Sequence, residues 1–233
     1  MWTDKGPEDP CPPHHSEPLA SGEVGRCRTP TRGLAPSAKL DPLMDTSQFT
    51  PADEHAMRIA LDQARNAWLV GEVPVGAVIM RQGQVIATGY NRPITTHDPT
   101  AHAELVALRH AAQLVENYRL PDCELYVTLE PCAMCAMALM HARFKRVVFG
   151  ATDLKTGAAG SVVDLFGQPL LNHHTQVQRG LLADECGQVL RDFFAERRAQ
   201  QKALRQAAAA AADIPAGEAF ELSRFPDLEG DPR

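Results

Sequence analysis

The sequence has 233 residues, a length that favours one folded domain with appendages or two small domains. Its 23 basic and 29 acidic side chains give a formal net charge of −6, which at first sight speaks against a nucleic-acid partner. The two ends of the chain carry the whole excess, because residues 46–205 hold 16 basic and 16 acidic side chains. The net charge therefore does not describe the central surface.

The chain divides into three parts. Residues 1–45 contain eight of the 18 prolines and show no helical or strand period, so we expect a disordered proline-rich extension. Residues 46–205 alternate helical and strand patterns and should form the folded domain. Residues 206–233 begin with alanines and end with prolines and acids, which indicates a disordered tail, although the last helix could continue through the alanines to 212.

The folded domain is expected to begin at Thr50 and Pro51, which offer a capping hydroxyl and a proline suited to the first helical position. Strands that alternate with helices after an opening hairpin predict an α/β fold, here a three-layer α/β/α sandwich around a mixed sheet of about five strands. The expected helices are 51–70, 101–117, 131–142 and 182–212, and the expected strands are 75–80, 84–90, 124–129, 146–150 and a short one from 177.

The sequence also predicts the compartment. No apolar run reaches the roughly 18 residues of a membrane span, and no charged and then apolar leader stands ahead of the first helix. We therefore expect a cytoplasmic protein. In that reducing compartment the six cysteines would be thiols or metal ligands rather than disulfides.

Two short motifs carry candidate metal ligands. His102 lies two residues before Glu104, and Cys132 lies three residues before Cys135. One imidazole and two thiolates make a three-ligand zinc site whose fourth position stays open, which is typical of catalysis. Two thiolates already balance the charge of the metal, so Glu104 would not be a ligand and would serve as general acid and base.

Each motif alone has a simpler interpretation. A lone Cys-x-x-Cys after a strand fits a redox pair, and a lone His-x-Glu fits ordinary polar residues on a helix. Both motifs stand at expected helix starts after a strand or a turn, and this shared placement favours a single zinc site built from the two.

The pairing of His-x-Glu with Pro-Cys-x-x-Cys resembles the zinc-dependent cytidine deaminase superfamily, and the wider sequence resembles the bacterial tRNA-specific adenosine deaminases. The resemblance implies the cytidine deaminase-like fold, a homodimer, and binding of the anticodon stem-loop of a tRNA. It also implies conversion of adenosine to inosine at the wobble position by a zinc-bound hydroxide. The similar stretches cover about residues 50–205 and include 71–78, 89–94, 97–104, 117–120, 125–132, 146–151, 155–161 and 182–186.

The same resemblance implies roles for individual residues. The ligands of one zinc ion per subunit would be His102, Cys132 and Cys135, with Glu104 as the proton shuttle. Without the resemblance, Asn91 would be assigned to a turn, Asp153 and Lys155 to a solvated loop, and Phe194 to side-chain packing. With it, they become candidate RNA contacts, namely Asn91, Asp153, Lys155 and Phe194.

Two other functions stay open at this point. The same zinc site would serve a deaminase of a free base or nucleoside, such as guanine or cytosine, and a third possibility is a zinc or redox module without catalysis. Basic residues within 143–146 and 191–205 would suit RNA phosphates, although a solvated helix face explains the second run equally well. The salt dependence of substrate binding separates an RNA substrate from a free base, because contacts to phosphates weaken steeply with ionic strength.

Overall fold

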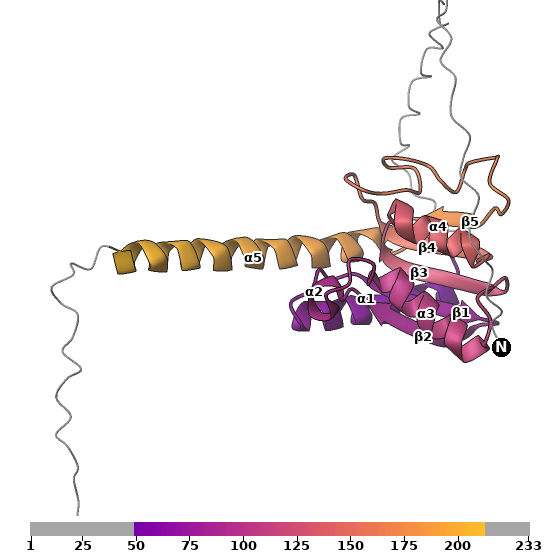
Figure 1. Cartoon of the computed structure of the whole chain (residues 1–233), viewed down its shortest axis with the longest axis horizontal. Coiled ribbons are helices and arrows are strands. Elements are labelled where there is room, and N and C mark those ends of the chain that lie inside the picture. The colour runs from indigo at the N-terminus through magenta and orange to yellow at the C-terminus, as the bar shows by residue number, and fades with distance from the viewer. Residues whose placement is uncertain (1–48, 213–233) are drawn as a thin grey trace, which may run out of the picture. The chain divides into compact units, whose positions relative to one another are not determined.

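The computed structural model describes residues 49–212 (Figure 1), so the extension predicted for 1–45 and the tail beyond 212 lie outside the described residues. No helix within 49–212 combines the length and apolar character needed to cross a bilayer. The elements, in chain order, are α1 (Pro51–Leu69), β1 (Gly76–Arg81), β2 (Gln84–Tyr90), α2 (Pro93–Thr96), α3 (Ala103–Val115), β3 (Cys123–Leu129), α4 (Ala133–His141), β4 (Arg146–Ala151), β5 (Gln176–Arg179) and α5 (Ala183–Ala212).

The five strands form one mixed sheet in the order β2-β1-β3-β4-β5 (Figure 1). β1 pairs antiparallel with β2 and β3, whereas β3, β4 and β5 run parallel to one another. A parallel pair needs a crossover connection, which α4 supplies between β3 and β4. The predicted α/β fold with a mixed five-stranded sheet is confirmed.

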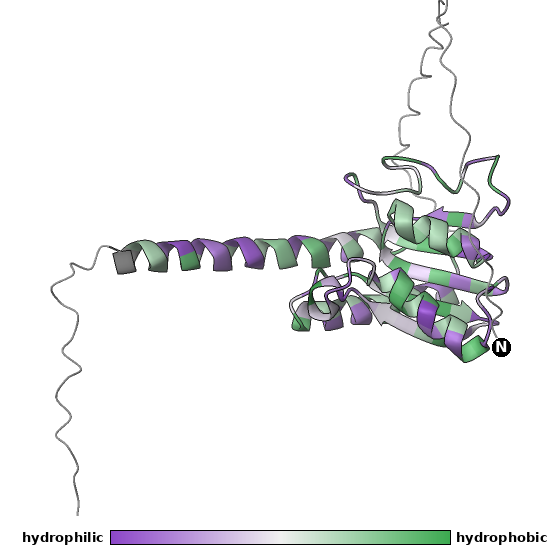
Figure 2. Cartoon of the chain, in the orientation of Figure 1, coloured by the Kyte–Doolittle hydropathy of each residue, from purple (hydrophilic) through white to green (hydrophobic). Residues whose placement is uncertain are grey.

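Each face of the sheet carries its own core, because successive strand residues point to opposite sides. On one face, Ile79 and Phe149 pack with buried residues of α3 and α4. On the other face, Val78 and Val148 pack with Met57 of α1 and with the start of α5. α4 is mostly hydrophobic in Figure 2, as its buried position requires. The sheet therefore lies between two helical layers.

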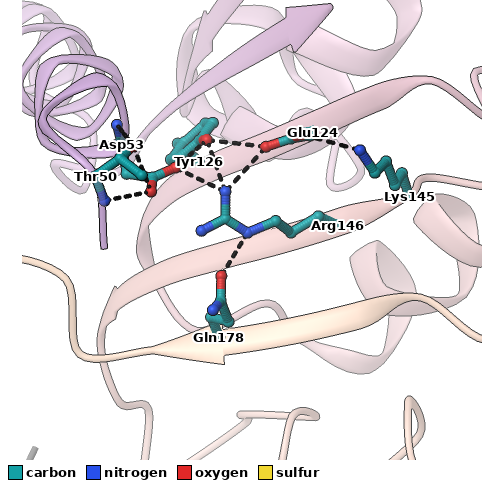
Figure 3. A network of polar contacts seen from close by, with 7 residues as sticks. All are labelled: Thr50, Asp53, Glu124, Tyr126, Lys145, Arg146 and Gln178. Atoms are coloured by element: carbon teal, nitrogen blue, oxygen red, sulfur yellow. Dashed lines mark hydrogen bonds and ion pairs between the residues drawn. The ribbon is translucent and has the colours of Figure 1, made fainter. Parts of the chain in front are cut away.

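A buried polar network fixes the start of α1 to the sheet (Figure 3). Arg146 Nη1 lies 2.7 Å from Asp53 Oδ1 and 3.0 Å from Glu124 Oε2, and the Tyr126 hydroxyl donates to Asp53 at 2.6 Å. Burial acts to raise the pKa of Asp53, but hydrogen bonds from Arg146, Tyr126 and Thr50 outweigh it and hold that pKa well below its usual value. The carboxylate is thus charged and fully partnered.

One element departs from the sequence expectations, and the last helix follows them. α2 is a single turn that we did not predict; it begins at Pro93, whose fixed φ suits a helix start. α5 ends at Ala212, where the sequence predicts that the last helix can end, and every side chain from Phe194 to Ala209 is exposed. Hydrophilic residues recur along this part of α5 in Figure 2.

Candidate active site

The starts of α3 and α4 bring the two motifs together. His102 is the N-cap residue of α3 and Cys132 that of α4, both with extended backbone (φ −71°, ψ 153° and φ −75°, ψ 171°). On a regular helix, residues two apart point about 200° away from each other. His102 lies just ahead of the helix and Glu104 in its first turn, so both side chains reach the same site.

Three ligand atoms form a compact group. His102 Nδ1 lies 3.6 Å from Cys132 Sγ and 3.6 Å from Cys135 Sγ, and all three atoms lie within 4.8 Å of one another. Tetrahedral zinc, with bonds of about 2.3 Å to sulfur and about 2.0 Å to nitrogen, separates those atoms by about 3.5 Å. Within residues 49–212 no other group of histidine, cysteine and acidic side chains has this arrangement. The residues fit a zinc ion.

The two thiols divide the charge between them. A hydrogen bond from Cys135 is the largest cause lowering the pKa of Cys132 to about 4, and His102 adds to the effect. The same contact, together with burial, raises the pKa of Cys135 far above its usual range. Without metal the pair therefore holds one thiolate and one thiol, and binding of a metal by both sulfurs releases a proton.

Glu104 is the buried carboxyl group of the site, with only 3% of its surface exposed. Burial is the largest cause raising the pKa of Glu104 to about 7, and the negative charge of Cys132 acts in the same direction. A carboxyl group balanced near neutral pH is suited to accepting and returning protons.

Asn91 is held at the same helix start. Its Oδ1 accepts a hydrogen bond from the backbone N–H of Ala103 at 2.9 Å, one of the free donors at the beginning of α3. Ala103 stands between His102 and Glu104, so Asn91 lies beside the ligand group. The assignment of Asn91 to a turn alone, which the sequence gives without the family resemblance, is therefore incomplete, and its contact with substrate stays a prediction.

Asp153 and Lys155 lie in the loop that follows β4. The Asp153 carboxylate accepts the backbone N–H of Lys155 at 2.8 Å and the hydroxyl of Thr156 at 2.6 Å, which fixes a tight turn. The Asp153 N–H in turn donates to Glu130 Oε2 at 3.0 Å. Since Glu130 precedes Pro131 and Cys132, this turn lies next to the ligand group.

Sequence reasoning gave Glu130 no role. The available signal was an acid at the end of an apolar strand, directly before Pro131, where a buried charge needs several partners. The structure shows these partners in the loop after β4, and Glu130 is only 3% exposed.

Phe194 lies farther along the molecule, on α5. It is 44% exposed and makes an edge-to-face contact with the buried Phe193, with ring centroids 5.4 Å apart. Both rings line a groove between α5 and α2 that also includes Ile94 and Arg197. The structure thus connects Phe194 to α2 rather than to the metal ligands.

Comparison with known proteins identifies the family. Residues 50–151 match the family described as the cytidine and deoxycytidylate deaminase zinc-binding region. A tRNA-specific adenosine deaminase of Haemophilus influenzae is 51% identical over 151 residues, covering 64% of this chain and 87% of the relative. The chain belongs to the tRNA-specific adenosine deaminases. The member of this family from Bacillus subtilis is 42% identical over 154 residues, 66% of this chain and 96% of its own.

Solved structures of two kinds of deaminase share this fold. A structure from a study of A-to-I editing by tRNA:A34 deaminases at the wobble position of transfer RNA has a TM-score of 0.57 and 46% identity, covering 58% of this chain and 99% of that one. A guanine deaminase from Nitrosomonas europaea has a TM-score of 0.52 and 26% identity, covering 63% and 85%. The predicted family, its fold and its zinc-binding group are confirmed.

Proposed function

We propose that this chain is a zinc-dependent hydrolase that converts adenosine to inosine at the wobble position of a tRNA anticodon. One observation carries the proposal: a buried Glu104 stands beside a His-Cys-Cys group that fits zinc and leaves one position open. This is the arrangement by which zinc deaminases attack C6 of adenine or C4 of cytosine.

The residues divide the chemistry between them. His102, Cys132 and Cys135 would hold a zinc ion, which would act as a Lewis acid that activates water for attack. Glu104 takes the proton that the attacking water loses and delivers it to N1 of adenine. Glu104 then carries the proton of the oxygen now bonded to C6 to the amino group, the C6–N bond breaks, and ammonia leaves. The water oxygen remains on C6 as the oxo group of inosine.

Four side chains are proposed to hold the RNA. Asn91 has its Oδ1 committed to Ala103, which leaves its Nδ2 amide to face the extruded nucleoside. Asp153 and Lys155 would meet the anticodon-loop backbone from their turn beside Glu130. Phe194 presents a half-exposed ring on which an unstacked base could lie.

The charge of α5 supports an RNA substrate. Arg198, Lys202 and Arg205 follow one another at spacings of four and three residues, so they share a face; we call them the α5 basic stripe. All three are exposed, and the acids Asp192 and Glu196 point from another face of the helix. Such a stripe suits a row of phosphates, which supply much of the affinity of proteins for nucleic acids.

We further propose a homodimer in the cytoplasm. The loop after β4 exposes large apolar side chains that a second copy would cover. They are Leu154, Val162, Val163 and Leu170. A reducing compartment keeps Cys132 and Cys135 available as metal ligands.

The test uses the full chain loaded with zinc. It is incubated with an unmodified anticodon stem-loop that carries adenosine at the wobble position, and in parallel with free guanine, because a guanine deaminase shares the fold. Inosine in the RNA supports the proposal. Release of ammonia from guanine alone would replace it with the free-base alternative.

A further inference from the structure

We propose that Glu130 is a positioning residue: its carboxylate fixes the loop after β4 against the metal-binding start of α4, so that Asp153 and Lys155 meet the RNA. The inference rests on the proposed function for its substrate, although the fixation of the loop is testable by itself. The hydrogen bonds of the Glu130 side chain go to the loop after β4 and not to the three metal ligands, and in this proposal Glu130 does not contact the substrate.

Both carboxylate oxygens of Glu130 accept hydrogen bonds from the loop after β4. Oε1 accepts the backbone N–H groups of Ala159 at 2.9 Å and Ser161 at 3.1 Å. Oε2 accepts the N–H of Asp153 at 3.0 Å and the hydroxyl of Ser161. Four donors from three residues converge on a carboxyl group that is 3% exposed, so the loop is built around this side chain.

The loop also leaves room for this carboxyl group. A Cβ atom added at Gly157 would lie 2.5 Å from Glu130 Cδ and 2.6 Å from Oε2, distances that real atoms do not adopt. The backbone at Gly157 therefore approaches the carboxylate more closely than any other residue type would permit.

The same loop contacts the start of α4. The N–H of Ala158 donates to the carbonyl oxygen of Pro131 at 2.8 Å, and Gly157 pairs with Cys132 as an isolated bridge. Glu130 directly precedes Pro131 and Cys132 in the chain. A single carboxylate thus sets the spacing between a zinc ligand and the turn of Asp153 and Lys155.

An amide in place of the carboxylate tests this arrangement. In Glu130→Gln the shape of the side chain is kept, but one acceptor oxygen becomes an NH2 donor that faces other donors. Asp164→Asn is the matched control, because Asp164 lies in the same loop and is exposed, and within residues 49–212 its side chain accepts only the N–H of Gly167. The substitution leaves the backbone bridge between Asp164 and Ala159 in place.

The first measurement is amide hydrogen exchange in the full-length, zinc-loaded protein. In Glu130→Gln the amides of Asp153, Ala159 and Ser161 should exchange at least ~10-fold faster, while the zinc content stays at one ion per chain. In Asp164→Asn they should not change. Unchanged exchange in Glu130→Gln, or loss of its zinc, would overturn the proposal.

The second measurement separates binding from chemistry. With the stem-loop substrate, Glu130→Gln should raise KM at least ~10-fold and change kcat less than ~3-fold, because the loop binds RNA and Glu104 is untouched. A fall in kcat at constant KM would overturn the positioning role. If the wild type makes no inosine, the proposed function fails, and amide exchange still decides whether Glu130 fixes the loop.

Ser161→Ala is a second variant that tests the same proposal if Glu130→Gln does not fold. It removes one of the four donors to Glu130 and leaves the carboxylate in place. The amides of Asp153 and Ala159 should exchange faster and KM should rise, each by less than in Glu130→Gln. Wild-type values of both quantities would contradict the proposal.

Discussion

His102 Nδ1 lies 3.6 Å from the Sγ atom of Cys132, although 30 residues separate the two in the chain. Each residue is the N-cap of a helix packed on the same face of the sheet. The positive ends of both helix dipoles therefore point at one place, where they favour the thiolate form of the ligand cysteines. The site is a property of two helix starts rather than of one loop.

The first prediction concerns Glu104. Glu104→Gln should retain one zinc ion per chain and lose a factor of about 10² to 10⁴ in kcat, because the amide cannot carry protons. Zinc analysis and single-turnover inosine formation on the same sample check it. Glu116→Gln, an exposed carboxyl at the far end of the same helix, is the control and should retain activity. Turnover by Glu104→Gln at the wild-type rate would refute the assigned role.

The second prediction concerns the thiols. Since the pKa of Cys132 is lowered to about 4 and that of Cys135 is raised, zinc binding at pH 7 should release at least one proton. Calorimetric titration of the apoprotein in buffers of different ionisation enthalpy counts the protons. Cys135→Ser should bind zinc far more weakly, whereas Cys186→Ala, a buried cysteine outside the ligand group, should bind it normally. Zinc binding without proton release would contradict this division of charge.

The third prediction concerns stability. The pKa of Asp53 is lowered in the folded state, so its contribution is fully present above pH 4 and is lost as pH falls through the folded pKa. Asp53→Asn should therefore lower the free energy of unfolding by about 2–3 kcal/mol at pH 7. Denaturant titrations should show a smaller deficit at pH 3. An equal deficit at both pH values would mean that the charge of Asp53 is not what stabilises α1.

The same variant separates stability from chemistry. Arg146 and Glu124 stand at the beginnings of β4 and β3, whereas Cys132 follows the end of β3. Zinc content and kcat of Asp53→Asn should therefore match the wild type at 25 °C. Loss of zinc in a folded Asp53→Asn would show that the network also shapes the metal site.

The fourth prediction concerns the α5 basic stripe. Changing Arg198, Lys202 and Arg205 together to Gln should weaken stem-loop binding and lower the slope of log K against log[salt] by about 2–3, at 0.7–0.9 per phosphate contact. The control adds the same charge change on another face of α5, by Ala199→Glu, Ala203→Glu and Ala207→Glu. Equal loss of affinity in both triple variants would mean that only the overall charge matters.

The sequence predicted the ligand set and all the elements except α2, because each of them has a local signal. Thr50 and Pro51 mark a helix start, and Cys132 and Cys135 have ligand spacing. Other features depend on contacts that no local pattern encodes. The partners of Glu130 lie 23 to 31 residues away, and Asn91 caps a helix 12 residues later. Neither relation leaves a period or a motif in the chain.

The net charge of −6 illustrates the same limit. Within residues 49–212 the charges are segregated by position: Asp53 and Arg146 neutralise each other inside, while Arg198 and Lys202 stand together outside on α5. A sum over the sequence hides both arrangements. The positions of charged side chains on helix faces, and not the net charge of the chain, therefore indicate where RNA could bind.

The most direct measurement of the central claim is mass spectrometry of an anticodon stem-loop after incubation with the zinc-loaded protein. The stem-loop carries adenosine at the wobble position and at other loop positions. We expect one inosine, at the wobble position alone, and none after the metal is removed by a chelator or in Glu104→Gln. A stem-loop that remains unchanged by protein with one zinc ion per chain would contradict the account.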